Sequence, residues 1–119
     1  DRMPMVRKFS DTKIQWGEGG SREDVIFRLG DTYLLCAEAY LGAGNKKLAL
    51  ERINSIRKRA AKDATAYEAM KLTDLDINVI MDERARELMG EHDRWFDLKR
   101  TQTLLKRNKV DGLSQNEGY

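Results

Sequence analysis

The sequence predicts an all-α fold made of stacked αα-hairpins, and three observations support this. From about residue 25 onward, apolar residues recur at spacings of three and four, the period of a helix with one buried face. Gly44 and Gly90 interrupt this pattern where helices are expected to end, because glycine readily takes the left-handed conformation that closes a helix. An extended segment is expected only in a short lead-in at Met5–Phe9.

The chain divides into three parts of different composition. Residues 1–24 hold the only proline, Pro4, and a cluster of glycines, and are expected to form an extended lead-in and a glycine-rich loop. Residues 25–107 carry the helical pattern and form the predicted helical domain. Residues 108–119 are polar and are expected to be a frayed tail.

The first two helices form a predicted hairpin. The first begins near Asp24 and ends at a glycine-rich turn, residues 42–45. The second runs from about Lys46 to Ala61. The residues expected on the buried faces are Leu29, Tyr33, Cys36, Ala37 and Tyr40 in the first helix, and Ala49, Ile53, Ile56 and Ala60 in the second.

The spacing within this hairpin is similar to that of one tetratricopeptide repeat. The small and aromatic positions of that motif are occupied, at the right mutual spacing, by Ala37, Tyr40, Gly44, Ala49 and Ile53. The closing proline of the motif is absent, since Ala61 stands in its place. The pattern therefore favours tetratricopeptide-like stacking of helix pairs.

A third helix is predicted to follow a polar link at residues 62–72. Thr73 or Asp74 is expected to cap its first turn, because a short polar side chain there accepts a hydrogen bond from a free backbone amide. The helix is expected to reach Met89, with Gly90 as its left-handed cap.

A fourth helix is predicted to begin after a cap at Asp93 and to run to about Lys106. Trp95 aligns with Leu98 and Leu105 on one face of this helix. We therefore expect Trp95 to anchor the core.

Arg84 lies on the stripe of the third helix that otherwise looks buried. That stripe consists of Ile77, Met81 and Leu88. A buried guanidinium is tolerated only when an acid and carbonyl groups satisfy it, so the position requires an internal ion pair. Glu38, at the edge of the inner face of the first helix, is the predicted partner, and Glu87 is its rival.

Composition excludes several classes of function. Charged residues reach 35%, but 22 basic and 20 acidic side chains leave a net charge of +2, which provides no long-range attraction for nucleic acid or an anionic membrane. No apolar run approaches the length of a membrane-spanning helix. The single cysteine, Cys36, is expected to be a buried, unreactive small hydrophobe.

No catalytic, metal or cofactor site is predicted. Glu83 and Glu87 lie on one helix surface, whereas glycoside hydrolysis needs two acids across a cleft. His92 is the only histidine and has no partner at metal-binding spacing. The glycines at 17–20 lack the lysine and the flanking strand and helix of a phosphate-binding loop.

Two further features are ambiguous. Trp16 lies in the glycine-rich loop, where no helical stripe requires it; burial against another part of the protein is the main expectation, and stacking on a sugar is the alternative. The basic run Arg57–Arg59, with Lys62, is expected to be a solvated helix face.

Four segments together resemble the C-terminal part of a known family. ERARELMGEHDRWFDLKR, at 83–100, is similar to the C-terminal signature of the SusD/RagB outer-membrane nutrient-binding lipoproteins. FRLGDTYLLCAEAYLGAG, at 27–44, and ALERINSIRKRA, at 49–60, resemble two preceding helices of that family, and Val6–Phe9 resembles its lead-in strand. Gly30 replaces an alanine often found there. The resemblance covers roughly residues 5–107.

This resemblance implies a non-catalytic, cell-surface protein of polysaccharide utilisation. It implies capture of a glycan or another nutrient for a TonB-dependent, SusC-like transporter, without a cofactor, and a lipid anchor in the outer membrane that lies outside this chain. The residues implied as structural scaffold are Arg28, Asp31, Glu38, Arg84, Glu87, Arg94, Trp95 and Asp97. The alternatives are a free-standing tetratricopeptide-like module that binds a peptide and, more remotely, a fragment of a glycoside-processing enzyme.

Overall fold

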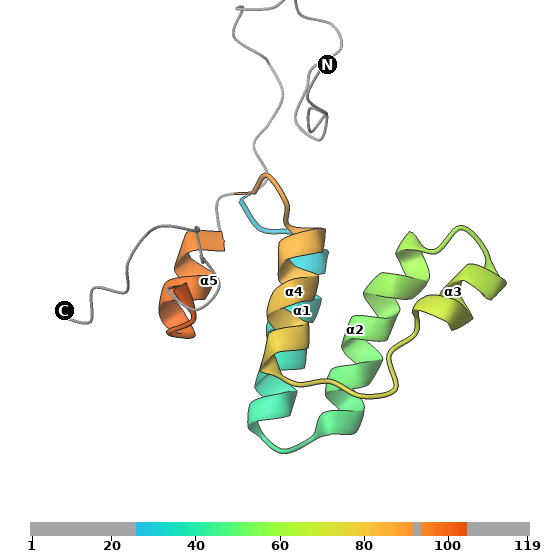
Figure 1. The fold of residues 1–119 in the computed structure, drawn as a ribbon, viewed down its shortest axis with the longest axis horizontal. Helices are drawn as coiled ribbons and strands as arrows, with labels where there is room; N and C mark the ends of the chain where they lie inside the picture. Colours follow the sequence, from blue (N-terminus) through green and yellow to red (C-terminus); the bar gives the residue numbers. More distant parts are fainter. Residues whose placement is uncertain (1–25, 92–93, 105–119) are drawn as a thin grey trace, which may run out of the picture.

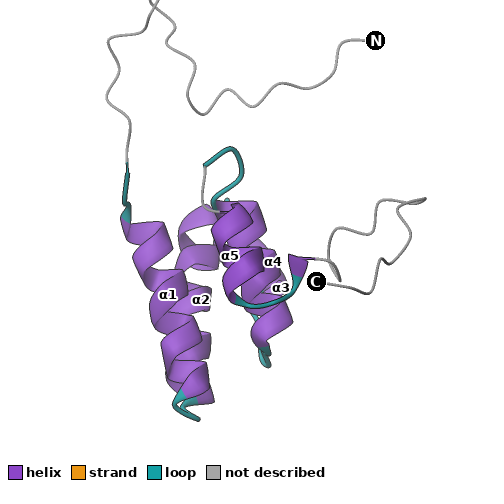
Figure 2. Ribbon diagram, turned by 90° about the vertical axis from the view of Figure 1, so that its left-hand side faces the viewer, coloured by secondary structure: helices purple, strands orange, loops and turns teal. Residues whose placement is uncertain are grey.

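The computed structural model describes residues 26–91 and 94–104, and all regular structure in these two ranges is helical. The predicted all-α class is therefore confirmed. Figures 1 and 2 show the arrangement of the helices. In chain order they are α1 (Leu29–Gly42), α2 (Lys46–Ala60), α3 (Ala64–Met70), α4 (Ile77–Glu87) and α5 (Arg94–Arg100).

A tight turn joins α1 to α2 and makes the predicted hairpin. Gly44 has a φ of 77°, a conformation that costs little only without a side chain. The Asn45 side chain then caps α2 by accepting a hydrogen bond from the Leu48 amide at 3.2 Å. The two helices consequently run antiparallel and pack along their lengths.

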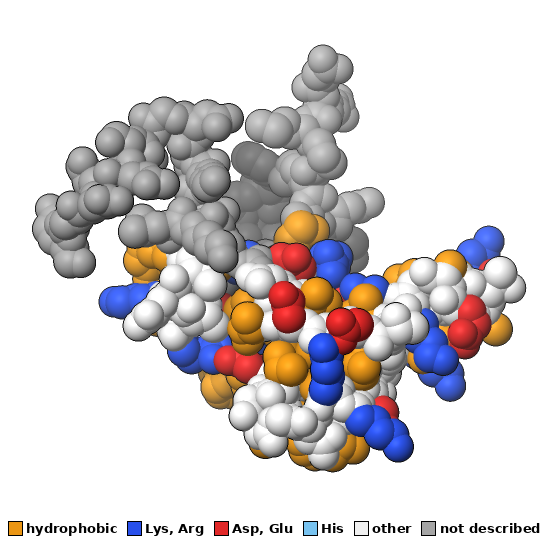
Figure 3. All heavy atoms as spheres, turned by 60° about the horizontal axis from the view of Figure 1, so that its bottom comes forward, with side chains coloured by type: hydrophobic (Ala, Val, Ile, Leu, Met, Phe, Trp, Pro, Cys, Tyr) orange, Lys and Arg blue, Asp and Glu red, His pale blue; other side chains and the backbone are white. Residues whose placement is uncertain are grey.

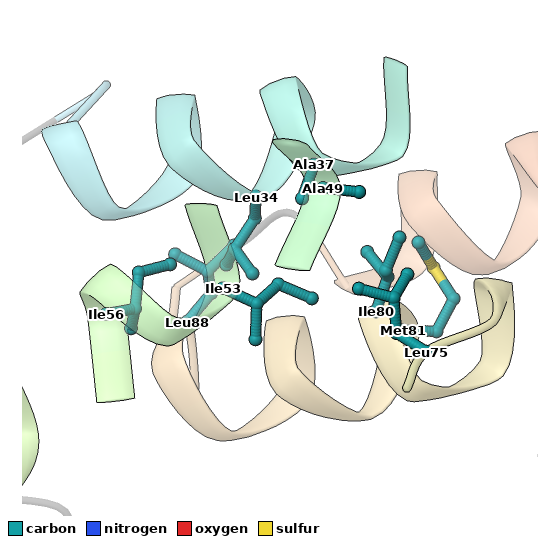
Figure 4. Packing of buried hydrophobic residues seen from close by; sticks show 9 residues of the cluster. All are labelled: Leu34, Ala37, Ala49, Ile53, Ile56, Leu75, Ile80, Met81 and Leu88. Atoms are coloured by element: carbon teal, nitrogen blue, oxygen red, sulfur yellow. The ribbon is translucent and has the colours of Figure 1, made fainter. Parts of the chain in front are cut away.

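The apolar core lies between α1, α2 and α4. Figure 4 shows side chains from these three helices and one loop pointing toward a common centre. Leu34, Ile53, Ile80 and Met81 are completely shielded from solvent. The cluster consists of Leu34, Ala37, Ala49, Ile53, Ile56, Leu75, Ile80, Met81 and Leu88.

The connection from α2 to α4 differs from the predicted polar link, because it contains the short helix α3. Asp63 caps α3 by accepting a hydrogen bond from the Ala66 amide at 2.8 Å. No residue of α3 is buried. The surface position explains why this helix lacks the apolar periodicity by which the other helices are recognised.

The start of α4 also differs from the prediction of a cap at Thr73 or Asp74. Asp76 is the capping residue, and its side chain accepts a hydrogen bond from the Val79 amide at 2.8 Å. Leu75, just before it, is 2% exposed and belongs to the core. Because Leu75 reaches the core from a non-helical segment, the helix begins later.

Six residues predicted to lie in the core of the first three predicted helices are exposed or only half-buried. Leu29 is 68% exposed, Ala60 is exposed and Ile77 lies at the surface, and the half-buried residues are Tyr33, Cys36 and Tyr40. The buried face of α1 instead comprises Gly30, Asp31, Leu34 and Ala37. Because α1 packs against both α2 and α4, its buried face differs from the face that its apolar residues alone would define.

Candidate functional site

The most distinctive chemistry of the described residues is a set of arginine–carboxylate contacts around α4. Arg84 and Glu83 of this helix are 3% and 6% exposed, and Asp31 of α1 and Asp97 of α5 are equally inaccessible. Burial of charge is costly unless each group is paired. Each of these buried charged groups therefore requires a partner of opposite charge.

Arg84 lies between two buried acids. Its Nε donates a hydrogen bond to Asp97 Oδ2 at 2.5 Å, and its Nη1 lies 2.8 Å from Asp31 Oδ1. The second contact is ionic but lacks hydrogen-bond alignment, and neither of its two atoms forms a hydrogen bond within the described ranges. The predicted pairing of Arg84 with Glu38 is wrong. The acid of α1 that contacts the guanidinium is Asp31, which lies two turns earlier on this helix.

Glu38 instead contacts Arg100 of α5. The Arg100 guanidinium donates from Nη1 to Glu38 Oε1, and from Nη2 to Glu38 Oε2 at 2.9 Å. Nη2 also donates to Asp97 Oδ1 at 3.1 Å. The hydrogen bond to Glu38 is the main cause that raises the pKa of Arg100 above its ordinary value. A continuous path of charge thus joins α1, α4 and α5.

A second group of contacts ties the start of α1 to the end of α4. Arg28 donates from Nη1 to Glu87 Oε1 at 2.5 Å, from Nη2 to the Glu87 carbonyl, and from Nε to Glu91 Oε1 at 2.9 Å. Arg59 of α2 donates to the same Glu87 oxygen at 2.5 Å. The hydrogen bond to Glu91 is the main cause that raises the pKa of Arg28. Arg28 also satisfies a backbone carbonyl in the last turn of α4.

The pKa of Glu87 reflects two opposing influences. Burial favours the neutral acid and raises the pKa, but hydrogen bonds from Arg28 and Arg59 favour the carboxylate. The hydrogen bonds prevail, and the pKa lies below its ordinary value of 4.5. Glu87 is therefore fully ionised near neutral pH and is a partner of Arg28, not the rival partner predicted for Arg84.

Gly30 leaves the space that this contact uses. A Cβ at this position would lie 2.5 Å from Arg28 Nη1 and 2.7 Å from Glu87 Oε1, closer than real contacts of this kind. The glycine found in place of an alanine therefore allows the guanidinium and the carboxylate to meet against the backbone of α1.

The basic run of α2 is not a simple solvated face. Arg57 donates to Glu83 Oε2 from Nη2 at 2.7 Å and to the Met70 carbonyl at 2.5 Å. Arg86 donates to the same carboxylate oxygen at 2.8 Å. The Arg57–Glu83 and Arg59–Glu87 pairs fix α2 to α4, whereas Arg86 and Glu83 pair within α4. Sequence reasoning missed the two pairs between helices because the partner acids lie in another helix.

Asn54 is a further structural residue that sequence reasoning did not identify. It is 9% exposed, and its side-chain amide donates to the Leu72 carbonyl and accepts from the Leu72 amide, both at 2.9 Å. A buried polar side chain in the middle of an amphipathic helix is the signal that identifies such a residue, since burial requires partners.

Arg94 and Trp95 of α5 lie in different environments. Arg94 donates from Nη1 to the Met81 carbonyl at 2.9 Å and so joins α5 to α4. Trp95 is 55% exposed, and its predicted role as a core anchor is wrong. Leu98 is the buried apolar residue of this helix, and the neighbouring Asp97 is buried against Arg84.

Two small hollows adjoin these contacts. One, of about 150 Å³, lies between α1 and α2 and is lined by Leu29, Gly30, Tyr33, Ser55, Ile56 and Arg59. The other, of about 180 Å³, lies beside the turn after α4 and is lined by Arg84, Ala85, Leu88, Met89, Gly90, Glu91, Arg94 and Asp97. Two acidic residues line the second hollow, and each pairs with an arginine: Glu91 with Arg28, and Asp97 with Arg84.

The remaining predicted positions are Trp16, the glycines at 17–20, His92 and Asp93. All lie outside the described residues. Within the described ranges, no group of three or more potential ligand side chains is placed to hold a metal ion. In the same ranges, no helix has the length and apolar character required to cross a bilayer.

Comparison with known proteins decides the family. The model of the SusD family matches residues 1–119, the whole of this chain. The chain belongs to the SusD family. The helical unit and its arginine–carboxylate contacts are therefore features of a SusD-family sequence.

Two relatives come from Formosa agariphila. SusD-like protein P38 is 32% identical over 99 residues, which are 77% of this chain and 20% of that protein. SusD-like protein P25 is 38% identical over 82 residues, 68% of this chain and 16% of that protein. The chain thus spans a fifth or less of the relatives it matches. No solved structure matches the chain significantly.

Proposed function

We propose that this chain is a non-catalytic part of a cell-surface protein that captures a glycan or another nutrient. The protein would be attached to the outer membrane by a lipid anchor. It would deliver this ligand to a TonB-dependent, SusC-like transporter in the same membrane. The observation that carries the proposal is the SusD-family match over the entire chain. The two SusD-like relatives give independent support.

The described residues fit a scaffold role within such a protein. Arginines engage five acidic side chains in the contacts that join α1, α2, α4 and α5: Asp31, Glu38, Glu83, Glu87 and Asp97. Fixed contacts of this kind set the orientation of helices more than they add stability. We therefore assign no sugar contact to these pairs, and Trp16 stays the candidate platform for a sugar ring.

Binding and hydrolysis are tested together on the complete polypeptide. A panel of soluble polysaccharides is screened by affinity electrophoresis, and release of reducing sugar is measured on every polysaccharide that retards the protein. We expect retardation without sugar release, and co-purification with the transporter from outer membranes. Sugar release that Glu83→Gln or Glu87→Gln abolishes would favour a glycoside-processing enzyme, and retention by peptides alone would favour a peptide-binding module.

Trp16→Ala tests the candidate platform, with Tyr67→Ala as the matched control. Tyr67 is a half-buried aromatic residue of α3, and it takes part in none of the arginine–carboxylate contacts described above. Loss of retardation in the first variant alone supports Trp16 as a sugar platform. Equal retardation of both variants would show that Trp16 does not contact the sugar.

A further inference from the structure

We draw no further inference here: the strongest candidate, the hollow between α1 and α2 lined by Tyr33, Ser55 and Arg59, carries none, because Arg59 already pairs with Glu87 and neither this lining nor the mixed apolar and charged surface in Figure 3 indicates what ligand or partner would fill or cover it.

Discussion

The three-helix core and α5 are stabilised by different kinds of interaction. In the core, α1, α2 and α4 surround nine apolar side chains, six of them completely shielded. In α5, Leu98 is the buried apolar residue, and the helix is fixed by Arg84, Arg94 and Arg100. Apolar burial is non-directional, whereas an arginine–carboxylate pair fixes both distance and angle.

This difference shows how a short helix is positioned without a large apolar face. A helix of seven residues has little intrinsic stability, so its place depends on tertiary contacts. Buried ion pairs add little net free energy but strongly disfavour arrangements in which a charge is left alone. The core therefore supplies stability, and the charged contacts decide where α5 lies.

The largest expected effect comes from removal of the shared arginine. Arg84→Ala leaves Asp31 and Asp97 buried without a cation and is expected to lower the free energy of unfolding by about 3–5 kcal/mol. Urea denaturation followed by circular dichroism measures the change. Arg86→Ala is the control, because this side chain is 58% exposed, and its loss is expected to cost less than about 1 kcal/mol. Equal effects of the two variants would contradict the role assigned to the buried pair.

Truncation in the core is expected to be next in size. Leu34→Ala removes a side chain that is completely shielded between the helices, and it is expected to cost about 2–5 kcal/mol through lost burial and a cavity. The same denaturation assay applies, with Leu35→Ala, on the exposed side of α1, as the control. A Leu34→Ala effect below about 1 kcal/mol would show that the core relaxes around the gap.

Release of α5 is expected to be a local effect. Arg100→Ala removes the contacts to Glu38 and Asp97, but the arginine side chain is 46% exposed, so global stability is expected to fall by only about 0.5–1 kcal/mol. Amide hydrogen exchange is expected to become faster in α5 and to stay unchanged in α2. Lys99→Ala, at an exposed position of the same helix, serves as the control. Faster exchange in α2 would mean that α5 and the core unfold together.

The Glu87 contacts are expected to make stability depend on acid pH. Because its folded-state pKa is lowered, ionised Glu87 contributes stability above its ordinary value of 4.5, and this contribution is lost as the pH falls through the lowered pKa. Glu87→Gln is therefore expected to flatten part of the acid limb of the stability–pH curve, measured by urea denaturation at a series of pH values. Glu51→Gln, on the exposed face of α2, is expected to leave the curve unchanged. Identical curves for wild type and Glu87→Gln would refute the assignment.

The smallest expected effect concerns Gly30. Gly30→Ala gains helix propensity of about 0.5–1 kcal/mol but displaces the Arg28 and Glu87 side chains, so the two effects nearly cancel. In an Arg28→Ala background, the same substitution is expected to be stabilising. Gly42→Ala is the control, because a Cβ there meets no atom within 4 Å, and it is expected to stabilise in either background. A Gly30→Ala effect that is the same in both backgrounds would show that the glycine does not accommodate the pair.

Local pattern was enough to predict several features of this protein. The helix of residues 46–60 follows from apolar spacing, and Gly90 has the expected positive φ, 81°. The burial of Arg84 also follows, because a helical stripe continues through it on either side. The SusD-like resemblance was readable for the same reason, since contiguous segments carry it.

Only the tertiary structure decided which groups meet. Asp31, not Glu38, faces Arg84, and Trp95 is exposed although its spacing matches a buried stripe. Helical periodicity determines the direction in which a side chain points from the axis of its own helix. It does not determine how one helix is rotated relative to another. That rotation is set by packing and by the pairing of buried charges, which involve residues far apart in the chain.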